Sequence, residues 1–215
     1  MKEYRNIELI KKVDDLHEEI CSEKKSNHHR DRFFPLLIEK LDLKTGCEIG
    51  VDKGEFSKHL LSKTSLKDLY CIDPWIDDFG SDYRPGFFDK DGNNRKLEAA
   101  NNLKEFGDRV NIIQSTSKEA SKLFDKNSID FVYIDGDHSL EGIYTDIYSW
   151  TPKVKLGGIV SGHDYKNGSG SGMKDYFGNQ LNYNVKTVLD DFCKRYGFKL
   201  KIVGGRILSW YFVKN

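Results

Sequence analysis

Short apolar runs alternate with amphipathic stretches along most of the chain. The apolar runs predict seven strands, at residues 46–50, 69–73, 110–114, 129–135, 157–163, 198–203 and 207–213. The amphipathic stretches predict helices at residues 7–20, 35–41, 56–63, 95–106, 117–124, 139–150 and 184–196. Gly107 and Gly197 follow two of these helices, where a glycine commonly caps the C-terminus.

This alternation predicts an α/β fold of the Rossmann-like, doubly wound type, with helices on both faces of a seven-stranded, mostly parallel sheet. Too few residues separate the last two strands for a crossover, so they should form a terminal antiparallel hairpin. Residues 1–30 are predicted to be an N-terminal helical extension. It either packs on the sheet's own helices or pairs with a second copy in a homo-oligomer. Pro35 can open the next helix, because a first-turn residue needs no N–H.

Two long stretches, 75–94 and 164–184, follow the second and fifth predicted strands and fit neither periodicity. Loops of this length are usually functional or disordered, and open α/β sheets bind ligands at the carboxyl ends of their strands. Both stretches carry several aromatic residues. They are interpreted either as lids over an acceptor site or as loops that their own aromatic side chains hold in place.

The composition restricts the class of protein. Lys and Arg together number 34, as do Asp and Glu, which argues against a long track for nucleic acid. No apolar run approaches the roughly 20 residues of a membrane span, and the first 20 residues lack a signal-peptide core. We therefore expect a cytoplasmic protein with neither nucleic acid nor a membrane as partner. The four cysteines form no C-x-x-C pair and are predicted to be reduced, with Cys47 and Cys71 buried.

The first strand runs into a glycine turn that suits a nucleoside ligand. Gly50 and Gly54 let the backbone turn tightly beside the N-terminus of the next helix. Their spacing is not the dinucleotide fingerprint, and Glu48 suits a cationic ligand better than a pyrophosphate. Asp73 ends the second strand about 20 residues later, where a carboxylate can bind both ribose hydroxyls.

Two further features fit the same ligand. Trp75 follows Asp73 closely, and its indole can cover an adenine face. Hydroxyl residues at 115–117, including Ser117, follow the third strand. They can bind the edge of the adenine or cap the next helix.

Acids and histidines gather at the ends of the fourth and fifth strands. Asp135, Asp137 and His138 follow one strand, and His163 and Asp164 follow the other. Two carboxylates with an imidazole suit a hard divalent cation such as Mg²⁺ or Mn²⁺. Such an ion can bind an acceptor hydroxyl, and His138 can take its proton. Alternatively the acids only cap loops, or Asp135 contacts the donor without a metal.

These motifs, in this order, resemble those of class I S-adenosylmethionine-dependent methyltransferases over nearly all of residues 31–215. The closest resemblance is to their small metal-dependent O-methyltransferases that act on macrolide sugars, and a more distant one is to catechol O-methyltransferase. The resemblance implies that the methionine part of the donor lies against Glu48, Gly50 and Gly54. It also implies that Asp73 binds the ribose and that Ser117 contacts the adenine.

For the chemistry, the resemblance implies that Asp135 binds the metal and His138 is the general base. It also implies that Asp164 and His163 complete the metal site. The chain has no Asn after Asp164 and a histidine where the catechol enzymes have a lysine, which favours a sugar or natural-product hydroxyl as acceptor. A nicotinamide-dependent oxidoreductase, or a catalytically silent nucleoside-binding protein, is the alternative.

Overall fold

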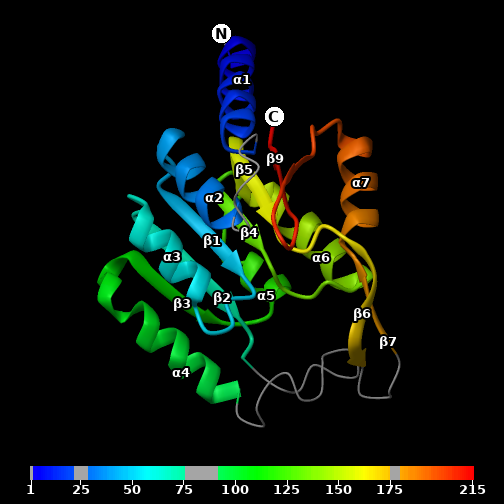
Figure 1. Cartoon of the computed structure of the whole chain (residues 1–215). Helices are drawn as coiled ribbons and strands as arrows, with labels where there is room; N and C mark the ends of the chain where they lie inside the picture. Colours follow the sequence, from blue (N-terminus) through cyan, green and yellow to red (C-terminus); the bar gives the residue numbers. More distant parts are fainter. Residues whose placement is uncertain (1, 22–28, 76–91, 175–179) are drawn as a thin grey trace.

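The computed structural model describes residues 2–21, 29–75, 92–174 and 180–215, which form a sheet between two layers of helices (Figure 1). The central sheet has the strand order β3-β2-β1-β4-β5-β9-β8. Its strands are β1 (Thr45–Ile49), β2 (Asp68–Asp73), β3 (Val110–Gln114), β4 (Ile129–Ile134), β5 (Val154–Gly162), β8 (Lys201–Val203) and β9 (Ser209–Val213).

The pairing within this sheet confirms the predicted fold class. β1 pairs in parallel with β2 and β4, and β4 pairs in parallel with β5. β9 runs antiparallel to both β5 and β8, so the predicted terminal hairpin is present. The chain therefore reverses its strand order between β1 and β4, which is where doubly wound sheets leave room for a ligand.

Helices cover both faces of the sheet through two separate cores. One core buries residues of α1 (Lys2–Cys21), α2 (His29–Lys40), α3 (Glu55–Lys63) and α4 (Gly92–Leu103). The other buries residues of α5 (Ser117–Ser121), α6 (Leu140–Trp150) and α7 (Val185–Tyr196). Two short 3-10 helices, η1 (Lys104–Arg109) and η2 (Thr151–Lys153), complete the set of described helices.

The N-terminal helix packs on the chain's own fold. Val13, Leu16 and Ile20 of α1 are buried in the first core. His17 hydrogen-bonds the Tyr211 hydroxyl at 3.1 Å. The predicted extension therefore covers the edge of the sheet near β8 and β9, although its first half extends beyond the body (Figure 1). Pairing with a second copy stays a prediction.

The second helix begins earlier than expected. Pro35 was predicted to open it, but α2 begins at His29 and contains Pro35 in its interior. A proline there removes the N–H that would bond the carbonyl of residue 31. The His59 ring donates a hydrogen bond to the Asp31 carbonyl at 2.7 Å, so the carbonyl that proline deprives of its partner is satisfied from α3.

One of the two stretches expected to be irregular contains regular structure. β6 (Asn167–Lys174) and β7 (Gln180–Asn184) form a separate antiparallel hairpin within residues 164–184. It lies at the lower end of the molecule in Figure 1, where β5 ends and α6 begins. Most of the other stretch, residues 76–91, lies outside the described residues, so its role as a lid stays a prediction.

The cysteines and the helices were also the subject of expectations from the sequence. Cys47 and Cys71 are fully buried free thiols, as predicted. No helix within the described part of the chain is long and apolar enough to cross a membrane.

Candidate functional site

The glycine turn lies against the end of β4. The Asp135 amide donates to the Ile49 carbonyl at 2.8 Å, which brings the two strand ends level. Gly50 has φ +84°, and a Cβ at this position would lie 2.2 Å from the Asp135 carbonyl oxygen. Gly54 (φ 76°, ψ 17°) then closes the turn and caps the N-terminus of α3. Both predicted glycines are thus required by backbone conformation, and the first also by close approach.

Asp73 ties the glycine turn to the end of β2. Its carboxylate accepts hydrogen bonds from the backbone amides of Asp52, at 2.9 Å, and Trp75, at 2.8 Å. Burial raises the pKa of Asp73, and these backbone donors partly offset that effect. The predicted ribose-binding carboxylate therefore lies beside the turn, as its motif requires.

Trp75 is buried rather than open to a ligand. Its indole is 1% exposed and donates from Nε1 to the Asp52 carbonyl at 2.7 Å. The indole therefore hydrogen-bonds the backbone of the glycine turn, and the predicted contact with adenine stays a prediction.

Glu48 and Ser117 both make internal hydrogen bonds. Glu48 is 2% exposed and accepts a hydrogen bond from Ser57 of α3, and burial raises its pKa to about 8. Ser117 donates to buried Asp146 and accepts from Trp150 Nε1 at 2.8 Å. The predicted contacts of Glu48 with the methionine part and of Ser117 with adenine stay predictions.

Helix capping after the third strand is supplied by a neighbour of Ser117. Thr116 accepts a hydrogen bond from the Glu119 amide and caps α5. The capping role considered for the hydroxyl residues 115–117 is therefore confirmed at Thr116.

Two carboxylates and two histidines meet at the ends of β4 and β5. His138 Nε2 lies 3.4 Å from Asp135 Oδ1 and 3.4 Å from Asp164 Oδ2. His163 Nδ1 lies 3.6 Å and 3.5 Å from the same two oxygens. All four predicted residues are thus brought together, around one small volume.

The charges within this cluster are strongly coupled. Burial alone would raise the pKa of both carboxyls, but the two histidines lower the pKa of Asp135 and, with Lys166, lower that of Asp164 to about 2. Burial would lower the pKa of His163, but the two carboxylates raise it to about 9. The acids are therefore ionised at neutral pH.

Asp137 does not join the cluster. Its carboxylate accepts from the amide and the hydroxyl of Ser139, at 2.9 and 2.8 Å. Ser139 in turn caps α6. Asp137 therefore has the capping role that strand-end acids often have, while Asp135 faces the histidines.

Two residues near the cluster, Lys166 and Arg30, were not singled out from the sequence, whereas Tyr183 is one of the aromatic residues in the stretch 164–184 for which a lid role was considered. Lys166 Nζ lies 2.8 Å from Asp164 Oδ1 and 4.0 Å from the centroid of the Tyr183 ring. The Tyr183 ring lies 5.2 Å from the His138 ring. Arg30 of α2 reaches to 3.9 Å from Asp135 Oδ2. No local pattern indicates the contacts of Arg30 and Tyr183, since they depend on how separate elements pack.

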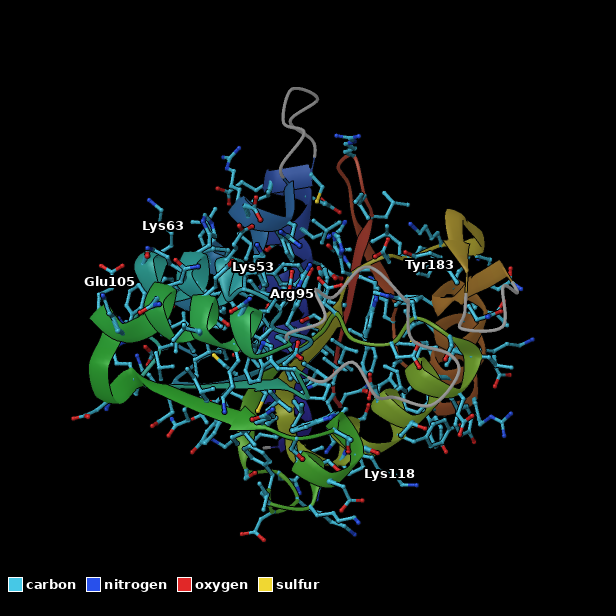
Figure 2. The ribbon with its side chains drawn as sticks, turned by 90° about the horizontal axis from the view of Figure 1, so that it is seen from below. Lys53, Lys63, Arg95, Glu105, Lys118 and Tyr183 are labelled. Atoms are coloured by element: carbon cyan, nitrogen blue, oxygen red, sulfur yellow. The ribbon has the colours of Figure 1, made fainter. Side chains whose placement is uncertain are left out.

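The hairpin is attached to the loop that carries the predicted base. The Asn184 amide, at the end of β7, donates to the His138 carbonyl at 3.0 Å. Viewed onto this end of the molecule, Tyr183 lies on the hairpin side and Arg95, which pairs with Asp52 of the turn, lies on the side of α4 (Figure 2). The site thus has a turn side and a hairpin side, with the cluster between them.

Comparison with solved structures identifies the fold. The chain is similar to a protein described as a caffeoyl-CoA O-methyltransferase from Staphylococcus aureus, with 16% identity over 94% of this chain and 91% of that chain and a TM-score of 0.64. It is also similar to an O-methyltransferase from Bacillus cereus in complex with S-adenosylhomocysteine, with 12% identity over 96% and 90% of the two chains and a TM-score of 0.58.

A third similar structure is the 1,6-didemethyltoxoflavin-N1-methyltransferase of Burkholderia thailandensis with bound S-adenosylhomocysteine. It is 12% identical over 100% of this chain and 90% of that chain, with a TM-score of 0.58. A search of curated proteins gives no match. At these identities the structures show the fold and not the acceptor.

Comparison with protein families is more specific. A family model described as a methyltransferase domain matches residues 47–165, which is more than half of the 215 residues and spans both the glycine turn and the cluster. The chain therefore belongs to this methyltransferase family, and it has the class I fold that its motifs resemble.

Proposed function

We propose that this chain transfers a methyl group from S-adenosylmethionine to a hydroxyl oxygen of a small polar acceptor, such as a sugar or natural product. The observation that carries the proposal is the meeting of Asp135, His138, His163 and Asp164 directly beside the Gly50 turn. A donor seated in the turn would present its methyl group to an acceptor held at the cluster.

The residues of the cluster fit a divalent cation. One ligand atom from each of Asp135, His138 and Asp164 lies within 4.8 Å of the others. Within the described residues His138 Nε2 is buried without a hydrogen-bond partner, an arrangement that the hydroxyl of a bound acceptor would relieve. Ligand atoms that share one Mg²⁺ lie about 3 Å apart, and His163 Nδ1 lies 3.6 Å and 3.5 Å from the Asp135 and Asp164 oxygens.

The chain's own side chains supply the proton chemistry. The O–CH₃ bond forms as the S–CH₃ bond breaks, the sulfonium becomes a thioether, and the hydroxyl proton passes to His138. A divalent cation, held by Asp135 and Asp164 with His163 as a further ligand, would lower the pKa of that hydroxyl. The Lys166 ammonium adds positive charge beside the oxygen that loses the proton.

The donor part of the proposal is tested by isothermal titration with S-adenosylhomocysteine. The folded wild-type chain should bind it, and Asp73→Asn should bind about 10- to 100-fold more weakly, because a neutral amide replaces the carboxylate that faces two ribose hydroxyls. Asp68→Asn is the matched control, since it changes an acid at the other end of the same strand. If the wild-type chain does not bind at high micromolar ligand, the proposal is refuted.

The acceptor part needs a turnover assay. Hydroxyl compounds, including sugars, are incubated with S-adenosylmethionine and Mg²⁺ or Mn²⁺, and release of S-adenosylhomocysteine is measured. NMR of the methylated product then locates the new methyl group. Methylation at nitrogen, as the name of the Burkholderia thailandensis protein states for that enzyme, would overturn the choice of oxygen.

A further inference from the structure

Arg30 brings a cation to the ends of β1 and β4 from outside the family-matched region. Its guanidinium carbon lies 4.5 Å from the centroid of the Phe56 ring, in the first turn of α3. Its Nη1 lies 3.9 Å from Asp135 Oδ2, and the side chain is 28% exposed. Arg30 therefore lies at the surface of the site rather than in the core.

Helix stability does not account for this arginine. It lies in the first turn of α2, where the unpaired amides disfavour a positive charge. Its Nε donates to Asp31 at 3.0 Å, which orients the guanidinium. Proximity to Asp135, Asp31 and Tyr133 raises the pKa of Arg30, so the guanidinium is charged at any working pH although burial opposes this.

The ligand group that Arg30 faces follows from the turn. The methionine part of a donor seated at Gly50 must lie beside both the turn and Asp135, because the two backbones are in contact and leave no space between them. This part of the donor carries one carboxylate and one ammonium group. Asp135 is an acid and cannot bind the carboxylate, whereas a guanidinium binds a carboxylate with two parallel N–H donors.

The other described cations nearby have closer acidic partners. Lys53 pairs with Glu98 at 2.8 Å. Arg95 pairs with Asp52 of the turn. Lys166 pairs with Asp164 at 2.8 Å on the hairpin side. Arg30 pairs with Asp31 through Nε at 3.0 Å, but its Nη1 lies 3.9 Å from Asp135, so Nη1 can donate to a further anion.

We propose that Arg30 binds the α-carboxylate of the methyl donor. The proposal rests on the proposed function, because it needs the donor in the turn between Gly50 and Gly54. It adds a ligand contact from α2, which precedes the matched domain, and it gives the first turn of that helix a binding role.

The test compares two ligands that differ in the amino-acid part. S-Adenosylhomocysteine carries the carboxylate, whereas 5′-methylthioadenosine keeps the adenosine and the thioether but lacks it. In Arg30→Met, whose side chain still covers Phe56, titration should show affinity for S-adenosylhomocysteine reduced about 10- to 100-fold. Affinity for 5′-methylthioadenosine should change by less than about twofold, because no charge-assisted hydrogen bond is lost.

Two further variants sharpen the comparison. Arg30→Lys should fall between the wild type and Arg30→Met for S-adenosylhomocysteine, because it keeps the charge and loses the paired donors. Lys58→Met, which removes a cation of α3 that pairs with Glu105, should bind both ligands as the wild type does.

Each other outcome overturns the inference. Equal weakening of both ligands in Arg30→Met would mean that Arg30 acts through the fold. Unchanged affinity for S-adenosylhomocysteine would mean that the carboxylate binds elsewhere. A wild-type chain that binds neither ligand would remove the proposed function itself, and this result is visible before any variant is made.

Discussion

Replacing Gly50 by alanine should damage both the fold and the site. A non-glycine residue at positive φ costs about 1–2 kcal/mol. The added Cβ would also lie 2.2 Å from the Asp135 carbonyl oxygen and 2.8 Å from the Gly136 Cα, so the turn must move away from β4. Forced overpacking typically costs about 1–3 kcal/mol. The free energy of unfolding should therefore fall by about 2–5 kcal/mol in total.

Gly197→Ala is the matched control. Gly197 also has positive φ, +73°, but a Cβ there would meet no atom within 4 Å. Only the conformational cost applies, so the loss should be about 1–2 kcal/mol. For a chain of this size each kcal/mol lowers the melting temperature by about 2–4 °C, so calorimetry and urea unfolding can separate the two variants.

Ligand binding separates the two variants more sharply. Gly50→Ala moves the turn relative to Asp135, so it should lose measurable affinity for S-adenosylhomocysteine at temperatures where circular dichroism shows it to be folded. Gly197→Ala, at the C-terminus of α7, should bind as the wild type does. The reasoning is refuted if the two variants lose equal stability, or if folded Gly50→Ala binds S-adenosylhomocysteine normally.

Two further predictions concern the titratable groups. For the histidines, His138→Ala should abolish turnover with a true acceptor, while its affinity for S-adenosylhomocysteine stays within about twofold of wild type. His163→Ala should weaken Mn²⁺ binding more than His138→Ala does. The opposite order in Mn²⁺ titrations would exchange the roles of base and metal ligand between the two histidines. Burial raises the pKa of Glu48 to about 8. The folded state therefore holds more protons than the unfolded state between about pH 4.5 and 8. The contribution of protonated Glu48 to the free energy of unfolding is lost as pH rises through that window. Glu48→Gln removes the titration, so the stability of the variant relative to wild type should increase from pH 5 to pH 8 in urea unfolding; a constant difference would show that Glu48 does not titrate there.

The strands of the sheet could be predicted because their signals are local. Each buried strand is a short apolar run, and the glycine turn or acid that follows marks its carboxyl end. The hairpin within residues 164–184 was missed for the converse reason. Its first strand has the sequence NGSGSGMK, in which repeated glycine and serine give no alternation of apolar and polar positions.

The start of α2 was mispredicted because its cause is not local. Proline usually opens a helix or breaks one, and the sequence around Pro35 contains no sign that a partner for the freed carbonyl exists. That partner is the His59 ring, 28 residues from Asp31 in the chain. A tertiary hydrogen bond thus satisfies the carbonyl that Pro35 leaves without a helical partner, in a helix that begins at His29 and includes Arg30.

The cluster at the strand ends was predictable in membership but not in detail. Parallel neighbours deliver their ends to one edge, so Asp135 and Asp164 were expected to approach each other. How the two histidines approach the carboxylates depends on loop geometry: Asp164, which stands between His163 and Lys166, has φ +53°. Aspartate adopts positive φ more often than most non-glycine residues, but its presence in the sequence does not by itself predict such a turn.

The structure divides the site into two parts that are held differently. The turn and the cluster are joined by the parallel ladder, in which Ile134 pairs with both Ile49 and Gly162. Neither part can shift along the sheet without breaking backbone hydrogen bonds, so the separation between donor and cluster is set by the sheet. The hairpin, by contrast, pairs with itself alone, and it reaches the cluster through Lys166, Tyr183 and one backbone hydrogen bond to His138. Changes in the hairpin can therefore alter what is held beside the cluster while the donor geometry stays fixed, and that makes the hairpin the part of the chain in which acceptor selectivity should be sought.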